Sequence, residues 1–181
     1  TRAVGLDLAL GTGLSGDAEG DTYTSIEDVL GSDHGDSILG DAGINVIDGG
    51  AGDDFIDGRA GQDQLFGNEG DDFFIWGGGE DTFDGGLGVD TVSLEEIQTS
   101  ITVQLSETDS PTITFSDGSI YSSFIDIESV RGSSAHDTYI GDGGINWLEG
   151  GLGDDFLNGA EGSDTYVYNL GDGNDTISET D

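Results

Sequence analysis

The sequence predicts an all-β fold of short parallel strands stacked in coils, because a nine-residue unit repeats along most of the chain. From residue 31 to residue 93, the chain divides without a gap into seven such repeats. Position six is an acid in six repeats and asparagine in one, whereas position eight is always apolar. No stretch shows the apolar period of about 3.6 residues that an amphipathic helix requires. A fixed period of this kind is the sequence signature of a repeat architecture.

One repeat, GGAGDDFID at residues 49–57, shows how the unit is expected to fold. Glycines at positions one, two and four allow positive φ and tight curvature, so the first six residues are expected to form a turn. Positions seven to nine are expected to form a short strand, with the position-eight side chain pointing into the core. Two repeats would close one coil of about 18 residues, and successive coils would stack their strands in parallel.

The turns also bring oxygen atoms together. Unshielded glycine carbonyls can point into one small space, and the acid at position six adds a carboxylate there. An all-oxygen site of this kind suits a hard cation of the size of Ca²⁺. The expected metal ligands are Asp36, Gly50, Gly52, Asp54, Gly61, Asp63, Gly70, Asp72, Gly79, Asp81, Gly86, Gly88, Asp90, Asp137, Gly151, Gly153, Asp155, Gly162, Asp164, Gly171, Gly173 and Asp175.

These repeats resemble the RTX family, the haemolysin-type calcium-binding nonapeptide repeats of secreted bacterial proteins. The resemblance implies a parallel β-roll, a β-solenoid in which an ion lies between turns of neighbouring coils on the same side. The departures from the pattern include His34, Asn45, Arg59 and Trp76. Asn45 lacks the position-six charge and is expected to weaken one site, and turn 31–36 is expected to be the poorest ion-binding turn.

The whole unit occurs twice. Repeats resume at residue 132, so that Gly31 and Gly132 are 101 residues apart, and Asn45 is matched by Asn146. Together with this duplication, the resemblance implies two tandem RTX rolls. They are joined by a short segment with two strand-like runs, ITVQL and TITFS, expected to form a hairpin. The expected domains are residues 1–93, with repeats at 31–93, and residues 94–181, with repeats at 132–178.

Charge dominates the composition of the 181-residue chain, which has 39 acids, 3 basic residues and a formal net charge of −36. Carboxylates in turns that stack about 4.8 Å apart repel one another strongly without counter-charge. The core is also thin, with about one apolar side chain per nine residues, so burial alone would hardly offset chain entropy. Bound ions are the expected source of the missing free energy, and the stacking predicts roughly 5 to 8 calcium ions.

Other functions find little support in the sequence. The charge opposes nucleic-acid binding, no segment is long and apolar enough to span a membrane, and the chain has no cysteine. His34 and His136 fall at different positions of equivalent repeats, and no GxSxG element places a nucleophile. The chain is therefore not expected to be an enzyme.

A calcium-binding module is the function that the sequence favours. Sites built from flexible turns are expected to bind calcium at about 0.1 to 1 mM, so they would fill outside the cell. The resemblance implies a larger secreted bacterial protein, exported by type I secretion, in which this chain folds on extracellular calcium and serves as a folding, secretion or scaffold domain. The alternative is a calcium-dependent glycan or cell-surface (adhesin-type) binding module, with Trp76 and Trp147 as candidates to stack on sugar rings. Other domains of the parent protein are further expected partners.

Overall fold

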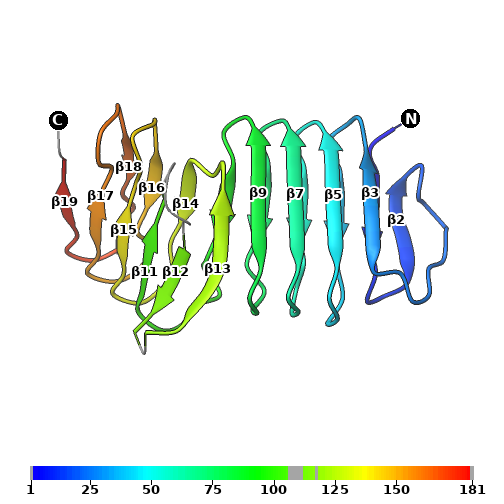
Figure 1. The fold of residues 1–181 in the computed structure, drawn as a ribbon, viewed down its shortest axis with the longest axis horizontal. Coiled ribbons are helices and arrows are strands. Elements are labelled where there is room, and N and C mark those ends of the chain that lie inside the picture. Colours follow the sequence, from blue (N-terminus) through cyan, green and yellow to red (C-terminus); the bar gives the residue numbers. More distant parts are fainter. Residues whose placement is uncertain (1, 106–111, 117, 180–181) are drawn as a thin grey trace.

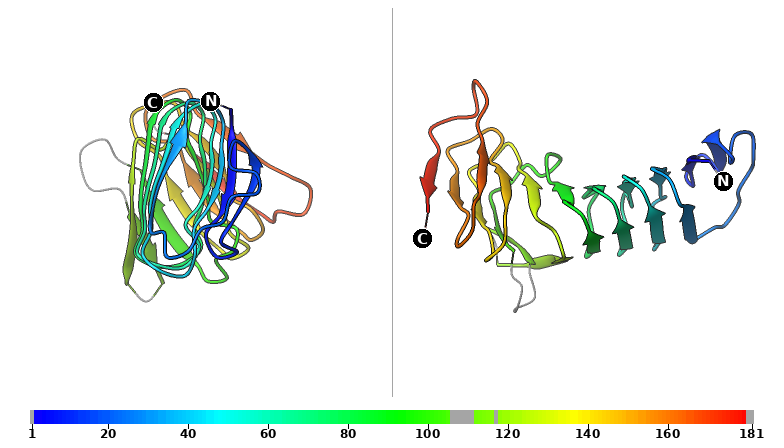
Figure 2. Two further views of the ribbon diagram at one scale, coloured as in Figure 1. Left: turned by 90° about the vertical axis from the view of Figure 1, so that its right-hand side faces the viewer. Right: turned by 90° about the horizontal axis from the view of Figure 1, so that it is seen from above.

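The computed structural model describes residues 2–105, 112–116 and 118–179, which form a solenoid of β-strands and turns. The strands stack along one axis, with the two ends of the chain at opposite ends of the stack (Figure 1). Viewed along that axis, the coils superimpose as a flattened ring (Figure 2). The predicted all-β parallel solenoid is confirmed. Nothing helical in the described residues is long and apolar enough to cross a membrane.

Two sheets make the long sides of the ring. Across the described residues, sheet 1 has the order β18-β16-β14-β10-β8-β6-β4-β1-β2, and sheet 2 has the order β19-β17-β15-β11-β12-β13-β9-β7-β5-β3. Sheet 1 consists of β1 (Val4–Asp7), β2 (Thr12–Gly16), β4 (Ser37–Leu39), β6 (Phe55–Asp57), β8 (Phe73–Ile75), β10 (Thr91–Ser93), β14 (Ser129–Arg131), β16 (Trp147–Glu149) and β18 (Thr165–Val167). Sheet 2 consists of β3 (Asp28–Ser32), β5 (Val46–Ala51), β7 (Gln64–Glu69), β9 (Thr82–Leu87), β11 (Ile101–Gln104), β12 (Thr112–Phe115), β13 (Ile120–Ile125), β15 (Thr138–Ile140), β17 (Phe156–Asn158) and β19 (Thr176–Ser178).

The strand of each repeat in the first copy pairs in parallel with the strand one coil further along. Ile38 lies opposite Ile56, and Ile56 lies opposite Phe74, so one coil spans two repeats as predicted. Successive side chains of a strand point to opposite faces, so position eight faces inward while its neighbours face outward. The position-eight residues of the first copy are all at most 1% exposed: Ile38, Ile47, Ile56, Leu65, Phe74, Phe83 and Val92.

Some turns are shorter than the six residues predicted. Strands β5, β7 and β9 continue past position nine into the first three positions of the next repeat. Gly50 pairs with Asn68, and Asn68 pairs with Gly86, because the backbone at position two still meets its equivalent in the next coil. The strands β4, β6 and β8 of sheet 1 end at position nine instead.

The segment between the two copies adds strands to sheet 2 without interrupting the stack. β11 pairs antiparallel with β12, as predicted for the two strand-like runs, and β12 pairs antiparallel with β13. β13 then pairs in parallel with β9, β14 with β10, and β11 with β15. Both sheets are therefore continuous from the first copy to the second, and a domain boundary at residue 93 stays a prediction.

This continuity places equivalent turns of the two copies on opposite sides of the ring. In the first copy, turns 31–36 and 49–54 lead from sheet 2 to sheet 1. Their equivalents in the second copy, turns 132–137 and 150–155, lead from sheet 1 to sheet 2. The N-terminal end does not follow the repeat, because β1 pairs antiparallel with β2 and parallel with β4.

Candidate metal centre

The position-six carboxylates are buried inside the turns. Those at most 3% exposed are Asp54, Asp63, Asp72, Asp81, Asp90, Asp137 and Asp155. Burying a carboxylate is strongly unfavourable unless hydrogen bonds or a positive charge compensate for the lost water. The partners of these oxygens therefore decide what the turns can bind.

One oxygen of most of these carboxylates has a partner in the preceding coil. The backbone N–H of Asp54 donates to Oδ1 of Asp72 at 2.8 Å, and the N–H of Asp72 donates to Oδ1 of Asp90 at 2.8 Å. Equivalent bonds from the preceding coil are accepted by Oδ1 of Asp54, Asp63, Asp81, Asp155, Asp164 and Asp175. These bonds fix the carboxylates in one orientation and connect successive coils.

The second oxygen, Oδ2, has no partner in many of these turns. Among the described residues, buried Oδ2 atoms without a hydrogen bond belong to Asp54, Asp63, Asp72, Asp90, Asp155 and Asp164. Buried polar atoms are almost always paired, so the same exception at equivalent positions indicates a place for a ligand of positive charge. We call the turns that end in these residues the open turns; they are 49–54, 58–63, 67–72, 85–90, 150–155 and 159–164.

Glycine at position one leaves room beside this oxygen. A Cβ added to Gly67 would lie 2.0 Å from Oδ2 of Asp72, and a Cβ added to Gly49 would lie 2.1 Å from Oδ2 of Asp54. The prediction of a positive φ at position one is wrong for both glycines, since the left-handed glycines of these turns are at other positions. Glycine is needed at position one because a side chain would fill the space that the carboxylate faces.

Backbone carbonyls add further oxygens between the coils. A Cβ added to Gly70 would lie 2.3 Å from the carbonyl oxygen of Gly52, one coil earlier, and a Cβ added to Gly88 would lie 1.9 Å from that of Gly70. Gly61, another predicted ligand, pairs with Gly79 in a parallel bridge. The remaining predicted glycine ligands have a positive φ; they are Gly50, Gly52, Gly70, Gly79, Gly86, Gly88, Gly151, Gly153, Gly162, Gly171 and Gly173.

This set of donors fits a calcium ion. Carboxylate and carbonyl oxygens are the ligands that calcium prefers, and its two positive charges would compensate for the buried carboxylate. In the part of the chain that the structure describes, no three His, Asp or Glu side chains gather into a metal-binding group. An ion in an open turn would be held by the position-six aspartate together with carbonyl oxygens of the glycine-rich positions.

In the ion-free chain, burial disfavours the charged form of these carboxylates. Desolvation raises the pKa of Asp54 and Asp90 to about 7, and that of Asp155 to about 6. The backbone N–H that each Oδ1 accepts acts against this rise, whereas the charge of Asp72 adds to it for both Asp54 and Asp90. A proton or a cation is therefore favoured at these positions.

In two other turns of the first copy, an oxygen of the position-six side chain accepts a hydrogen bond from a backbone N–H of its own turn. Oδ2 of Asp36 accepts the N–H of Ser32 at 2.6 Å, and Oδ1 of Asn45 accepts the N–H of Asp41 at 2.9 Å. In both turns the donor is the residue at position two. The predicted ligand Asp36 therefore has both oxygens in hydrogen bonds, since its Oδ1 accepts the N–H of Val4 at 2.6 Å.

In the equivalent turns of the second copy the position-six oxygen is also paired, by a backbone N–H in one turn and by side-chain hydroxyl groups in the other. Oδ1 of Asn146 accepts the N–H of Asp142 at 2.9 Å. Oδ2 of Asp137 accepts the hydroxyl groups of Ser133 at 2.5 Å and Tyr139 at 2.9 Å. We call 31–36, 40–45, 132–137 and 141–146 the closed turns. A role for Asp36 and Asp137 as metal ligands stays a prediction.

The backbone at position two separates the open turns from the closed turns. The open turns have a left-handed residue there, with φ between 64° and 104°: Gly50, Arg59, Asn68, Gly86, Gly151 and Ala160. The closed turns have Ser32, Asp41, Ser133 and Asp142, which lie outside the left-handed region. The N–H groups of Arg59 and Ala160 donate to Asp57 and Asn158 instead, and in all of the open turns Oδ2 keeps no partner.

Two further predicted ligands, Asp81 and Asp175, belong to neither group. Oδ1 of each accepts the usual backbone N–H from the preceding coil. The N–H of Asp81 itself donates to the Ser122 hydroxyl at 3.3 Å, because β13 rather than a repeat follows in the stack. Asp175 is half-buried in the last described turn.

Glu128 takes the place of a position-six acid where the two copies meet, and the sequence analysis missed it. The N–H of Asp90 donates to Oε2 of Glu128 at 3.0 Å, which is the bond that a position-six carboxylate accepts elsewhere. Burial raises the pKa of Glu128. The signal was present in the sequence, because Glu128 stands two residues before the buried Val130, as position six stands before position eight.

The comparison with known families agrees with this geometry. The family profile of the RTX calcium-binding nonapeptide repeat (4 copies) matches residues 30–65, 60–92 and 131–166, which together make up more than half of the chain. No curated protein matches the chain at a significant level. The matched residues contain all of the open turns, so the repeats identified from glycine and aspartate spacing are repeats of the calcium-binding type.

Proposed function

We propose that this chain, which belongs to the RTX calcium-binding nonapeptide repeat family, folds on binding extracellular calcium and serves as a folding, secretion and scaffold module of a larger secreted bacterial protein. Calcium binding follows from the family and from the all-oxygen turns. The coupling of calcium binding to folding goes beyond these two observations and is the part that we propose.

The observation that carries the proposal is the buried, unpaired Oδ2 of each open turn. Without an ion, folding would bury these carboxylates in a chain whose formal net charge is already −36. An ion that binds only the folded turns stabilises the fold in proportion to the logarithm of its concentration. The thin core leaves little else to offset chain entropy, so calcium is expected to decide whether the coils form.

The proposed location follows from the expected affinity. Calcium sites of extracellular modules typically bind at about 0.1 to 1 mM, far above cytosolic calcium levels. A chain with such sites would stay unfolded during export and fold outside the cell, as type I secretion requires. RTX repeats are typical of secreted bacterial proteins, which supports this location.

Far-UV circular dichroism during a calcium titration of the chelator-treated chain tests the proposal, with magnesium as the control ion. We expect a cooperative gain of β-signal near millimolar calcium and no gain with magnesium, which keeps its waters and demands a tighter octahedral site. A full β-signal in chelator that calcium does not change would refute ion-coupled folding.

A groove on the outer face of sheet 1 favours the alternative, a calcium-dependent glycan-binding module. It has a volume of about 400 Å³, and Phe73, Arg131 and Trp147 are among its lining residues. Trp147 is 50% exposed there. Trp76, the other candidate, instead packs against Phe115 with ring centroids 5.8 Å apart. An exposed indole beside charged groups is a surface on which a sugar ring can stack.

A glycan array probed with the calcium-loaded chain tests this alternative. A glycan-binding module predicts calcium-dependent binding that Trp147→Ala abolishes and Glu96→Ala, at an exposed acid, leaves intact. An array without calcium-dependent binding would reject it.

We also propose that the chain is not itself an enzyme. His34 and His136 are both exposed, and Nδ1 of His136 accepts the N–H of Asp154 at 2.8 Å. Each histidine belongs to a surface turn, which supports a structural role.

A further inference from the structure

Arg59 is the one basic residue at position two of the repeats, where glycine is the commonest residue. Its backbone is left-handed, with φ of 64°, and its N–H donates to Oδ1 of Asp57 at 2.8 Å. Ala160, the equivalent residue of the second copy, has φ of 69° and donates to Oδ1 of Asn158 at 2.9 Å. The two backbones are therefore alike, and only the side chains differ.

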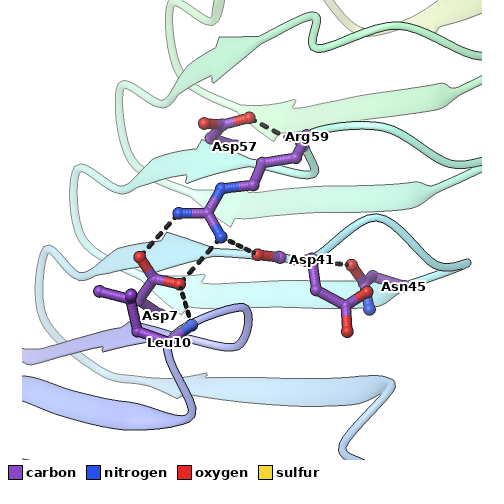
Figure 3. A network of polar contacts seen from close by, with 7 residues as sticks. Asp7, Leu10, Asp41, Asn45, Asp57 and Arg59 are labelled. Atoms are coloured by element: carbon purple, nitrogen blue, oxygen red, sulfur yellow. Dashed lines mark hydrogen bonds and ion pairs between the residues drawn. The ribbon is translucent and has the colours of Figure 1, made fainter.

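The Arg59 side chain extends back past turn 40–45 to the end of β1 (Figure 3). Nη1 donates to Oδ1 of Asp7 at 2.9 Å and to the carbonyl oxygen of Gly40 at 2.7 Å, and Nη2 donates to Oδ2 of Asp7 at 2.6 Å. The Asp7 side chain is 6% exposed and the Arg59 side chain 30% exposed, so this is a two-pronged, partly buried ion pair. Such charge-assisted pairs are among the strongest polar contacts in proteins.

The atoms around the guanidinium are of the kind that calcium would take. A carboxylate and a position-one carbonyl meet there, as they do between successive coils. A Cβ added to Gly67, for example, would lie 2.0 Å from Oδ2 of Asp72 and 2.7 Å from the carbonyl oxygen of Gly85. At turn 40–45 the preceding coil supplies no glycine-rich turn, since β1 lies beside β4 with Asp7 opposite Leu39.

We propose that the guanidinium of Arg59 is a fixed cation that fastens β1 to the first coil in place of a calcium ion. Turn 40–45 itself does not compete for an ion, because Asn45 carries no charge and its oxygen is already bonded to Asp41. In the second copy, turn 141–146 is preceded by the coil that contains Glu128, so it does not lie at an end of the stack. Alanine at position 160 accordingly suffices there.

The electrostatics of the pair are consistent with a built-in cation. The hydrogen bond from Arg59 holds the pKa of Asp7 below its usual range. Both groups are therefore charged in the folded chain at neutral pH. Unlike a bound ion, this cation is present at every calcium concentration.

Hydrogen–deuterium exchange of the calcium-saturated chain, with native mass spectrometry to count calcium ions, tests the proposal. Arg59→Ala reproduces the residue of the second copy, and Asp7→Asn removes the other half of the pair. We expect both variants to raise the exchange rate of the β1 amides by about tenfold or more, as loss of charge-assisted hydrogen bonds predicts. Strands β16 and β18, at the far end of sheet 1, should keep wild-type exchange rates.

The calcium count separates the fixed cation from an ordinary structural contact. Arg59→Ala should keep the wild-type count, or bind one more ion where the guanidinium was. An unchanged β1 exchange rate, or one calcium ion fewer, would overturn the proposal. Arg131→Ala, which removes a positive charge from β14 instead, is the matched control and should leave both readouts unchanged. If Arg59→Ala does not fold in calcium, the uncharged Arg59→Gln replaces it, and β1 exchange equal to that of wild type would then overturn the proposal.

Discussion

Turns 49–54 and 40–45 are built from nearly the same repeat, yet they use the position-six oxygen in opposite ways. In the open turn 49–54, Oδ2 of Asp54 is buried without a partner. In the closed turn 40–45, Oδ1 of Asn45 accepts the N–H of Asp41. The residue at position two makes the difference, since Gly50 is left-handed with φ of 104° and Asp41 is not. Whether a turn needs an ion is thus decided by a backbone angle as well as by an acid.

The largest expected effect is the pH dependence of the ion-free chain, because several open turns act together. The pKa of Asp54 and Asp90 is raised to about 7 in the folded chain, above the value in the unfolded chain. Such groups favour folding when protonated, and this contribution is lost as pH rises from about 4 to 7. In chelator, circular dichroism should therefore show more β-structure at pH 5 than at pH 8.

A matched pair of variants separates this effect from the general relief of charge repulsion. Asp54→Asn combined with Asp90→Asn should flatten the pH dependence, whereas Glu95→Gln combined with Glu96→Gln, both exposed, should leave it nearly unchanged. Equal flattening by the two pairs would mean that net charge alone is responsible.

Removing one charge from an open turn should have the next largest effect. Asp72→Asn keeps an acceptor for the N–H of Asp54 but removes the charge that faces the ion. We expect the loss of one calcium ion and a calcium midpoint raised by about tenfold, or roughly 1.4 kcal/mol. Calorimetric titration measures both quantities.

Asp36→Asn is the corresponding change in a closed turn. Both Asp36 oxygens already accept backbone N–H groups, from Val4 and Ser32. This variant should lower the free energy of unfolding by about 1 to 3 kcal/mol, because the amide nitrogen of asparagine cannot accept the second N–H, but it should lose no calcium ion. Loss of an ion here would show that closed turns bind calcium as well, and the distinction between the two kinds of turn would not hold.

An effect on the stability of the calcium-loaded chain, rather than on its pH dependence or calcium count, is expected when the room beside the carboxylate is filled. A Cβ in Gly67→Ala would lie 2.0 Å from Oδ2 of Asp72, so the turn must shift at a cost of about 1 to 3 kcal/mol. Gly43→Ala, in a closed turn, meets only the Asp41 side chain at 3.1 Å and should be nearly neutral. Thermal unfolding in saturating calcium measures both, and equal destabilisation would contradict the role given to position one.

The fold was predictable because the repeat is a local pattern. Position eight and position six are fixed by a nine-residue period, and the structure places Ile56 in the core and Asp54 in the turn as expected. The left-handed backbone of Asn68 and Ala160 was not predictable, since neither residue type requires it. That angle follows from the stacking of coils rather than from the residue itself.

Contacts between segments far apart in the sequence were equally unpredictable from the sequence. The pairing of Arg59 with Asp7 joins residues 52 positions apart, outside any repeat. The placement of equivalent turns on opposite sides of the ring depends on how many strands the joining segment adds to each sheet. Glu128 is the exception, because the spacing from acid to buried apolar residue would have identified it.

A crystal structure of the calcium-loaded chain, with anomalous scattering to locate the ions, tests the central claim most directly. The account predicts an ion bound to Oδ2 of Asp54, Asp63, Asp72, Asp90, Asp155 and Asp164, and none at Asn45 or Asn146. Ions distributed without regard to the open and closed turns, or unpaired Oδ2 atoms that remain without an ion in saturating calcium, would contradict it.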